Sequence, residues 1–243
     1  MNPIVIIPAR LKSTRLPGKA LAEIAGLPMI VHVLNRAREA AVGPVAVATD
    51  SREIAQTVEA AGGTAIVTIR EHACGTDRVG EALEIIDPQG RHDIVVNLQG
   101  DEPFLAQGAI RAALALLADA AVDMATLAAP AAPGEENDPN AVKLIASEIA
   151  PRRLRALYFT RSPAPWGEGP RYRHIGLYAF RRRAFDRYVG LPPSKLEQRE
   201  RLEQLRALED GMRIDAALLD KAGPSVDTRR DLDAARLHES PKQ

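Results

Sequence analysis

A segment close to the N-terminus concentrates cations and hydroxyl groups in a way that suits a polyphosphate. Residues 8–19 read Pro-Ala-Arg-Leu-Lys-Ser-Thr-Arg-Leu-Pro-Gly-Lys and carry four cations between Arg10 and Lys19. Arginine and lysine form charge-assisted hydrogen bonds with phosphate oxygens, and glycine lets the backbone approach them. The Gly-x-x-x-x-Gly-Lys-Ser/Thr spacing of P-loop NTPases is absent. The segment therefore predicts a triphosphate site of another kind, although a solvated basic loop has a similar composition.

A second polar segment, residues 97–103, follows the most apolar strand pattern of the chain. It reads Asn-Leu-Gln-Gly-Asp-Glu-Pro and carries the neighbouring carboxylates Asp101 and Glu102. Because Mg²⁺ prefers carboxylate oxygens together with substrate phosphates, Asp101 is a candidate metal ligand that would neutralise charge at an α-phosphate. A capped turn before the next helix is the alternative, since Asp and Pro are common in turns.

A third candidate is the turn Cys74-Gly75-Thr76-Asp77-Arg78, which begins a predicted helix. The backbone N–H groups and the dipole of a helix start suit nucleotide or carboxylate recognition, although for Thr76 alone ordinary capping is the favoured interpretation. Cys74 is the only cysteine, so no internal disulfide can form. This favours a reducing compartment, and we expect a cytoplasmic protein.

Alternating strand and helix patterns should bring these three segments together. Strands are predicted at 4–7, 45–48, 64–68 and 93–98, and helices at 28–41, 52–61, 78–86 and 110–117. This alternation indicates an α/β fold with a doubly wound, mostly parallel sheet. Ligands bind at the carboxyl edge of such sheets, where residues 8–19 and 97–103 both begin.

The pattern is less regular beyond about residue 119, which predicts a smaller, irregular α+β insertion in the second half. Strands are expected at 124–128, 141–146 and 175–180, and helices at 196–209 and 229–237. Glu197, Glu200 and Glu203 recur every three residues, which is typical of a solvated helix face. We expect a single domain over residues 1–243, with halves of about 1–118 and 119–243.

Composition excludes several classes of partner. The 32 basic and 32 acidic residues cancel, so no overall field attracts nucleic acid or an anionic membrane. No stretch approaches the roughly 20 apolar residues of a membrane span. The first apolar run ends at Pro8, which is too short for a signal peptide. We therefore expect no nucleic-acid partner and no membrane partner.

Seven segments, in order along nearly the whole chain, resemble the 3-deoxy-manno-octulosonate (Kdo) cytidylyltransferases, or CMP-Kdo synthetases. They are residues 13–19, 72–78, 99–103, 139–143, 174–178, 202–206 and 223–231. The resemblance implies a nucleotide-diphospho-sugar transferase-like fold and Mg²⁺-dependent transfer of CMP from CTP to the anomeric hydroxyl of Kdo, for lipopolysaccharide biosynthesis. It also implies a homodimer, a nucleotide-binding first half, and a second half for sugar binding and dimerisation.

The resemblance further assigns roles to individual residues. Arg15, Lys19 and Asp101 would be catalytic, and Asp101 and Asp227 would hold Mg²⁺. The nucleotide would be bound by Pro8, Ala9, Arg10, Ser13, Thr14, Arg15, Lys19, Cys74, Gly75, Arg78, Gln99 and Gly100. The sugar acid would be bound by Arg78, Gln99, Arg161, His174, Tyr178 and Glu203.

Departures from the family pattern lie on the sugar side. Residues 166–173 form a shorter segment than the family usually has, and Lys195 and Arg199 stand where proline and an apolar residue are frequent. These departures leave 8-amino-Kdo open as the acceptor. A sialic-acid-like sugar is a further alternative, although CMP-sialate synthetases usually have Gly-Ser-Lys in the phosphate loop. A non-catalytic nucleotide-binding protein on the same sheet is a remote alternative.

Overall fold

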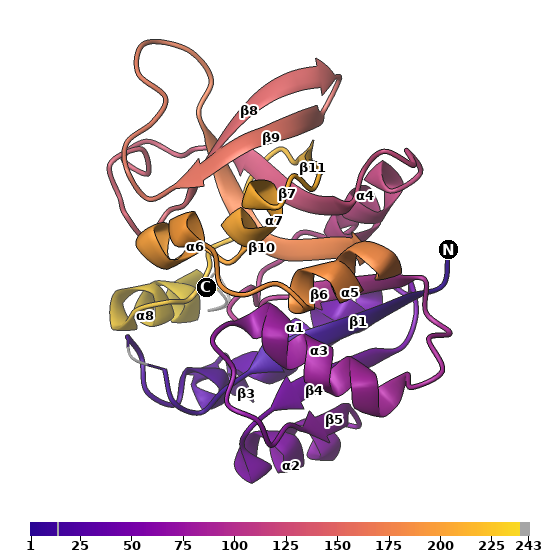
Figure 1. The fold of residues 1–243 in the computed structure, drawn as a ribbon. Helices are drawn as coiled ribbons and strands as arrows, with labels where there is room; N and C mark the ends of the chain where they lie inside the picture. The colour runs from indigo at the N-terminus through magenta and orange to yellow at the C-terminus, as the bar shows by residue number, and fades with distance from the viewer. Residues whose placement is uncertain (14, 239–243) are drawn as a thin grey trace. The chain divides into compact units, whose positions relative to one another are not determined.

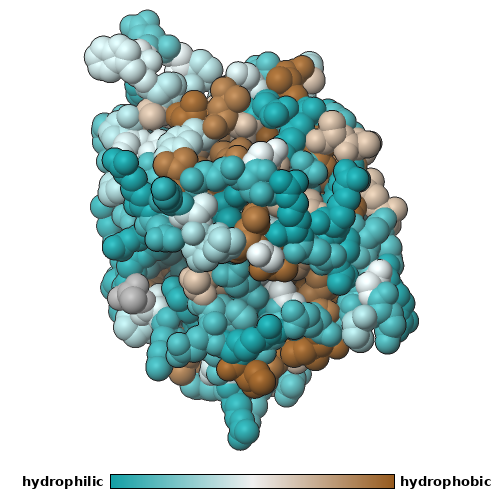
Figure 2. Space-filling view, in the orientation of Figure 1, coloured by the Kyte–Doolittle hydropathy of each residue, from teal (hydrophilic) through white to brown (hydrophobic). Residues whose placement is uncertain are grey.

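A computed structural model describes residues 1–13 and 15–238, so the candidate Thr14 lies outside the described residues. The chain divides into two compact units (Figure 1). Unit 1 comprises Met1–His92, Val96–Gln107 and Gly223–Gln243, and unit 2 comprises Asp93–Val95 and Gly108–Ala222. The face of the molecule seen in Figure 2 is mostly hydrophilic, with smaller apolar areas. Among the helices that the structure describes, none has the length and apolar character that a bilayer span requires.

Unit 1 is built on parallel strands in the order β5-β4-β1-β6. Their bounds are β1 (Pro3–Ala9), β4 (Val45–Thr49), β5 (Thr64–Val67) and β6 (Ile94–Leu98), the last of which begins in unit 2. Every residue of β1 and β6 is buried, as expected for strands covered on both faces. The parallel pairing places Ala9 of β1 beside Thr49 of β4, so the loops that follow these strands leave from one edge.

Helices α1 (Met29–Glu39), α2 (Arg52–Ala60) and α3 (Gly75–Ile86) connect these strands. The chain moves outward from β1 to β4 and β5, and α3 then returns it across the sheet to β6. Because crossovers of this kind are right-handed, the reversal places α3 on the opposite face from α1 and α2. In Figure 1, α3 crosses in front of the strands of unit 1. The predicted α/β fold with a doubly wound parallel sheet is confirmed.

The C-terminal segment belongs to unit 1. Helix α8 (Arg229–His238) contacts β2 (Glu23–Ile24), which pairs with β3 (Leu27–Pro28). Val226 and Leu232 are buried in an apolar cluster with Leu16 and Met29. The segment from Val226 to Leu232 is thereby fixed beside the first basic loop.

Unit 2 contains five strands in the order β10-β7-β11-β9-β8. They are β7 (Met124–Pro130), β8 (Lys143–Ala150), β9 (Arg153–Thr160), β10 (Tyr172–Arg181) and β11 (Ile214–Leu218). Only the β7–β11 pair is parallel among the pairs described in unit 2, and β10 also pairs with β8. Its helices are α4 (Ala109–Leu116), α5 (Arg182–Val189), α6 (Lys195–Glu200) and α7 (Gln204–Glu209).

The second half is more regular than the sequence pattern indicated. Strands β9 and β11 and helix α5 were not predicted, because charged residues interrupt their apolar periodicity. The boundary of the units lies near residue 107 rather than 118, since α4 packs against β7, β10 and β11. The segment from Gly223 returns to unit 1, so the units do not coincide with two halves of the sequence.

The single helix predicted at 196–209 is wrong. The chain forms α6 and α7 instead, and they are separated at Arg201, whose φ of 56° is left-handed. The solvated face expected for the glutamates is also wrong. Glu197 is buried, and the Glu200 carboxylate accepts hydrogen bonds from the Thr160 hydroxyl at 2.8 Å and the Arg161 backbone N–H at 3.0 Å.

The two helices are joined by a buried ion pair between Glu197 and Arg206. Arg206 Nε donates to Glu197 Oε2 at 2.8 Å, and Nη2 donates to Oε1 at 2.7 Å. The Arg206 side chain is only 2% exposed, and its guanidinium lies 4.6 Å from the centre of the Tyr188 ring. Two parallel hydrogen bonds of this kind fix the geometry of both partners.

We predict that Arg206→Met strongly destabilises the chain. The variant would leave the Glu197 carboxylate buried without its partner, and the free energy of unfolding should fall by about 3–5 kcal/mol in urea titrations. Arg36→Met is the control, because Arg36 and Glu39 form an exposed pair within α1. Its effect should stay below about 1 kcal/mol. Equal losses in the two variants would contradict the structural role of the buried pair.

Candidate active site

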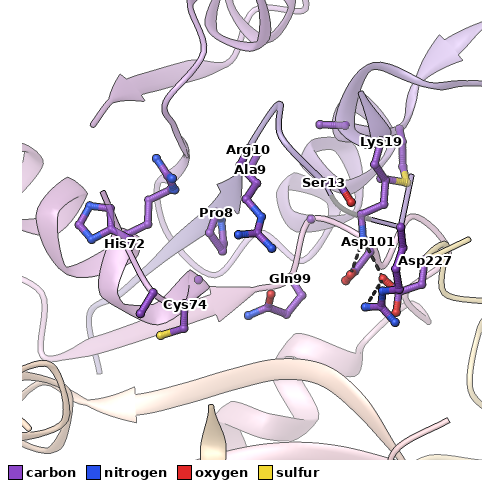
Figure 3. A pocket seen from close by; sticks show the side chains of 17 residues that line it. Pro8, Ala9, Arg10, Ser13, Lys19, His72, Cys74, Gln99, Asp101 and Asp227 are labelled. Carbon is purple, nitrogen blue, oxygen red and sulfur yellow. Dashed lines mark hydrogen bonds and ion pairs between the residues drawn. The ribbon is translucent and has the colours of Figure 1, made fainter. Parts of the chain in front are cut away.

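A pocket lies at the carboxyl ends of β1 and β6 in unit 1 (Figure 3). The loop after β1, the start of α3, the segment after β6 and the C-terminal segment all contribute to it. Its lining consists of Pro8, Ala9, Arg10, Ser13, Arg15, Lys19, Ala20, Met29, His72, Ala73, Cys74, Gly75, Arg78, Gln99, Gly100, Asp101 and Asp227. This lining includes every described residue predicted to bind the nucleotide or the metal.

The loop after β1 is shaped by one turn and one apolar anchor. The carbonyl of Leu11 accepts hydrogen bonds from the backbone N–H groups of Ser13 at 3.1 Å and Gly18 at 3.2 Å. Gly18 has a φ of 70°, a conformation that favours glycine, and it directly precedes the short 3₁₀ helix Lys19–Leu21. Leu16 is buried in the apolar cluster, whereas the Arg15 side chain is partly exposed. The loop is therefore fixed to the core, while Arg10, Arg15 and Lys19 line the pocket.

Lys19 lies between two carboxylates that come from distant parts of the sequence. Its Nζ is 2.9 Å from Asp101 Oδ2 and 2.9 Å from Asp227 Oδ1. Arg15 Nη2 is 3.1 Å from the same oxygen of Asp227. The backbone N–H of Val226 donates to the Asp101 carbonyl at 3.0 Å, which holds the two acidic segments side by side.

These charges stabilise one another in a half-buried site. Burial would lower the pKa of Lys19, but the negative charges of Asp101 and Asp227 outweigh it and raise the pKa above its ordinary value. Burial would likewise raise the pKa of Asp227, but Lys19 and Arg15 hold that pKa below its ordinary value. Lys19 and Asp227 are therefore both charged at neutral pH.

The donor set of the acidic pair is compatible with a divalent cation. The two carboxylate oxygens converge on one point, since both bind the same ammonium group. Within residues 1–13 and 15–238 no group of three or more His, Cys, Asp or Glu side chains could hold a metal ion. Mg²⁺ commonly uses one or two carboxylates and completes its coordination with phosphate oxygens and water, which this arrangement allows.

Two glycines line the pocket where β1, β6 and the start of α3 meet. A Cβ atom on Gly75 would lie 3.2 Å from Pro8 Cγ and 3.3 Å from the side-chain amide of Gln99. A Cβ atom on Gly100 would lie 2.9 Å from the backbone oxygen of Pro8, which is closer than real contacts allow. Glycine at both positions lets the start of α3 and the ends of β1 and β6 pack closely.

Arg78 lines the pocket, but its guanidinium is also bound within the protein. It donates to Asp50 Oδ2 at 2.9 Å and to the hydroxyl of Thr68. Sequence reasoning did not single out Asp50 or His72 as site residues. Asp50 directly follows β4, at the same sheet edge as the basic loop, and this position was the signal that could have found it.

Four of the predicted sugar-binding residues lie in unit 2, and the structure brings two of them together. His174 and Tyr178 are buried on β10, with stacked rings whose centres are 5.5 Å apart. His174 Nε2 is 2.9 Å from the Thr126 hydroxyl, and the Tyr178 hydroxyl donates to Gln204 Oε1 at 3.0 Å. Both side chains are thus held in a polar network inside the unit.

Arg161 and Glu203 occupy more open positions. The Arg161 guanidinium donates to the backbone carbonyls of Pro139 at 2.8 Å and Glu200 at 3.0 Å. Glu203 directly precedes α7, and its backbone carbonyl accepts a hydrogen bond from the Tyr188 hydroxyl at 3.0 Å. The sugar-binding roles of these residues remain predictions.

Comparison with known proteins decides the family. A family model described as cytidylyltransferase matches residues 4–214. The chain is 61% identical to the 3-deoxy-manno-octulosonate cytidylyltransferase of Methylobacterium radiotolerans, over 97% of this chain and 96% of that protein. The chain belongs to the 3-deoxy-manno-octulosonate cytidylyltransferase family. The member of this family from Rhodopseudomonas palustris is 62% identical, over 96% of this chain and 95% of that protein.

Solved structures agree with this membership. A CMP:2-keto-3-deoxy-manno-octonic acid synthetase complexed with CTP has a TM-score of 0.88 and 39% identity, and the match covers 98% of each chain. A UDP-glucose pyrophosphorylase complexed with UDP-glucose has a TM-score of 0.72 at 14% identity, over 98% of each chain. The second likeness shows the shared fold alone. The predicted family is confirmed, and so is its nucleotide-diphospho-sugar transferase-like fold.

The buried His174 gives a prediction for stability against pH. Burial and the neighbouring charge of Arg173 lower its pKa from 6.5 to about 3. Below pH 6.5 the unfolded chain binds a proton at this position and the folded chain does not, so stability falls as pH falls. The loss is at most about 1.4 kcal/mol per pH unit from this residue.

Urea unfolding at pH 7, 6 and 5 measures this dependence. Wild type should lose stability over that range, and His174→Gln should show a shallower slope because glutamine does not titrate. An unchanged slope in the variant would mean that His174 is not held neutral in the folded chain.

Proposed function

We propose that this chain transfers CMP from CTP to the anomeric hydroxyl of Kdo, giving CMP-Kdo and diphosphate for lipopolysaccharide biosynthesis. The observation that carries the proposal is the pocket of unit 1, in which Arg15 and Lys19 of the first loop form ion pairs with the carboxylates Asp101 and Asp227. Family membership supports the choice of CTP and Kdo, since the relative at 61% identity carries the name 3-deoxy-manno-octulosonate cytidylyltransferase.

In this proposal the residues of the pocket position and neutralise the triphosphate. Arg10, Arg15 and Lys19 bind phosphate oxygens, and the hydroxyl of Ser13 adds a donor. The anomeric oxygen forms a bond to the α-phosphorus, and the proton of its hydroxyl passes to solvent water. The bond from the α-phosphorus to the bridging oxygen breaks, and diphosphate leaves. Such a reaction depends mainly on positioning and charge neutralisation, which these residues supply.

We assign Asp101 and Asp227 as the protein ligands of Mg²⁺. Their oxygens converge on the Lys19 ammonium, which is the arrangement that a divalent cation needs from two carboxylates. When bound, the ion would neutralise negative charge at the α-phosphate and the sugar oxygen. Lys19 would then be available to the phosphate oxygens.

The remaining parts of the proposal concern the acceptor, the oligomeric state, the cellular location and the partners. Contacts with the sugar acid are part of the proposal for Arg78, Gln99, Arg161, His174, Tyr178 and Glu203. A homodimer is supported by family membership. A cytoplasmic location is supported by the single cysteine, and the balanced charge argues against a nucleic-acid or membrane partner. No observation favours 8-amino-Kdo, a sialic acid or a non-catalytic role.

Replacing one carboxylate tests the catalytic part. Asp101→Asn should keep the fold but lower turnover about a hundredfold or more, because the amide is a poor metal ligand and carries no charge. Diphosphate release from CTP and Kdo in the presence of Mg²⁺ is the measurement. Asp220→Asn is the matched control, since Asp220 is 87% exposed and pairs only with the surface residue Arg152 among the contacts described. Retained activity in Asp101→Asn would show that Asp101 is a turn residue and not a metal ligand.

The acceptor is tested on the wild-type chain. CTP is offered with Kdo, 8-amino-Kdo or N-acetylneuraminate, and kcat/KM is compared. Preference for Kdo is expected. Preference for either other acid would overturn the proposed acceptor, and CTP binding without diphosphate release would overturn the enzymatic function itself.

A further inference from the structure

The segment between β5 and α3, residues 68–74, has no apolar anchor in its middle. Ile69 is 90% exposed, and Arg70 and Glu71 are exposed as well. Burial of apolar surface, which fixes most segments in a folded chain, therefore contributes little here. The position of this segment must come from polar contacts.

One carboxylate supplies these contacts. Glu81, on α3, is only 4% exposed, and its Oε1 accepts a hydrogen bond from the Ile69 backbone N–H at 2.8 Å. Its Oε2 accepts from the Arg70 backbone N–H at 3.2 Å and lies 2.6 Å from His72 Nε2. Arg70 Nε adds an ion pair at 3.4 Å. A single side chain thus binds groups of Ile69, Arg70 and His72 along one segment.

Residues 68–74, held by these contacts of Glu81 (the Glu81 clamp), lead directly into the pocket. His72, Ala73, Cys74 and Gly75 all line it, whereas Glu81 does not. In Figure 3, His72 and Cys74 lie at the opposite end of the pocket from Asp101 and Asp227. With the triphosphate at the end that holds the cations and the carboxylates, the nucleoside end of CTP falls beside His72 and Cys74.

We infer that Glu81 is a positioning residue for the nucleoside end of CTP, acting through residues 69–74 and touching no substrate; this inference rests on the proposed function. The carboxylate fixes the segment against α3, and the segment forms the wall on which the cytidine lies. Loss of the Glu81 clamp weakens CTP binding and leaves unchanged the end of the pocket that holds Asp101 and Asp227.

The chemistry of the clamp requires a carboxylate rather than an amide. Burial would raise the pKa of Glu81, but hydrogen bonds from Ile69, His72 and Arg70 hold the pKa below its ordinary value. Both oxygens are acceptors facing N–H donors. A glutamine would turn one of them into an NH₂ group, which would face a donor and leave it without an acceptor.

The test compares Glu81→Gln with wild type by calorimetric titration of CTP and by steady-state kinetics. We expect the Kd and the KM for CTP to rise about tenfold, as for loss of a buried hydrogen-bond acceptor. The KM for Kdo and kcat should stay within about twofold, because the triphosphate and metal residues are untouched. Hydrogen exchange should accelerate at residues 68–74.

Glu197→Gln is the matched control, because Glu197 is another buried carboxylate that holds its partner through two oxygens. It should lower thermal stability without changing the Kd for CTP. A Kd for CTP within twofold of wild type in Glu81→Gln, measured where both are folded, would overturn the inference and leave the proposed function intact. Wild type that fails to bind CTP would instead overturn the proposed function, and the inference with it.

A variant with a shorter carboxylate covers the case in which Glu81→Gln does not fold. Glu81→Asp keeps the charge but cannot reach both ends of the segment. It should give a smaller rise in the Kd for CTP, with the same lack of effect on the KM for Kdo. Unchanged CTP affinity in Glu81→Asp, together with faster exchange at residues 68–74, would show that the position of the segment does not matter to the nucleotide.

Discussion

The site depends on one ammonium group shared by two carboxylates. Asp101 and Asp227 would repel each other if left alone, and Lys19 balances them at 2.9 Å from each. This contact joins the first loop, the end of β6 and the C-terminal segment, which are far apart in the sequence. The Val226–Asp101 backbone hydrogen bond and the apolar cluster around Leu16 support the same junction. These contacts therefore fix three segments of unit 1 around a small group of opposite charges.

Different kinds of interaction fix the two ends of the pocket. The charged end is fixed by apolar burial of Leu16 and by ion pairs, which leaves the Arg15 side chain partly exposed to solvent. The other end is fixed by glycine contacts at Gly75 and by the polar clamp of Glu81. In the proposed function, the triphosphate of CTP lies at the charged end and the nucleoside lies at the other end.

Sequence patterns predicted unit 1 well because its strands are apolar runs and its helices are amphipathic. Because parallel strands end at one edge of a sheet, the sequence also predicted that the loop after β1 and the segment after β6 lie close together, and both line one pocket. Local patterns could not show that Asp227 joins them, and that placement came from the family resemblance. They also misjudged Glu197, because a buried partner such as Arg206 is invisible to helical spacing. Asp50 and Glu81 were missed for a similar reason, since their roles lie in contacts across the fold.

We propose that Asp101 and Asp227 hold a divalent cation next to the triphosphate, at the place where they now bind Lys19. A crystal structure of the chain with CTP and Mn²⁺, in which anomalous scattering locates the metal, tests this most directly. We expect Mn²⁺ to be bound by both carboxylates and by a phosphate oxygen, with Lys19 turned to the triphosphate. Mn²⁺ bound elsewhere, with Lys19 still between the two carboxylates, would contradict it.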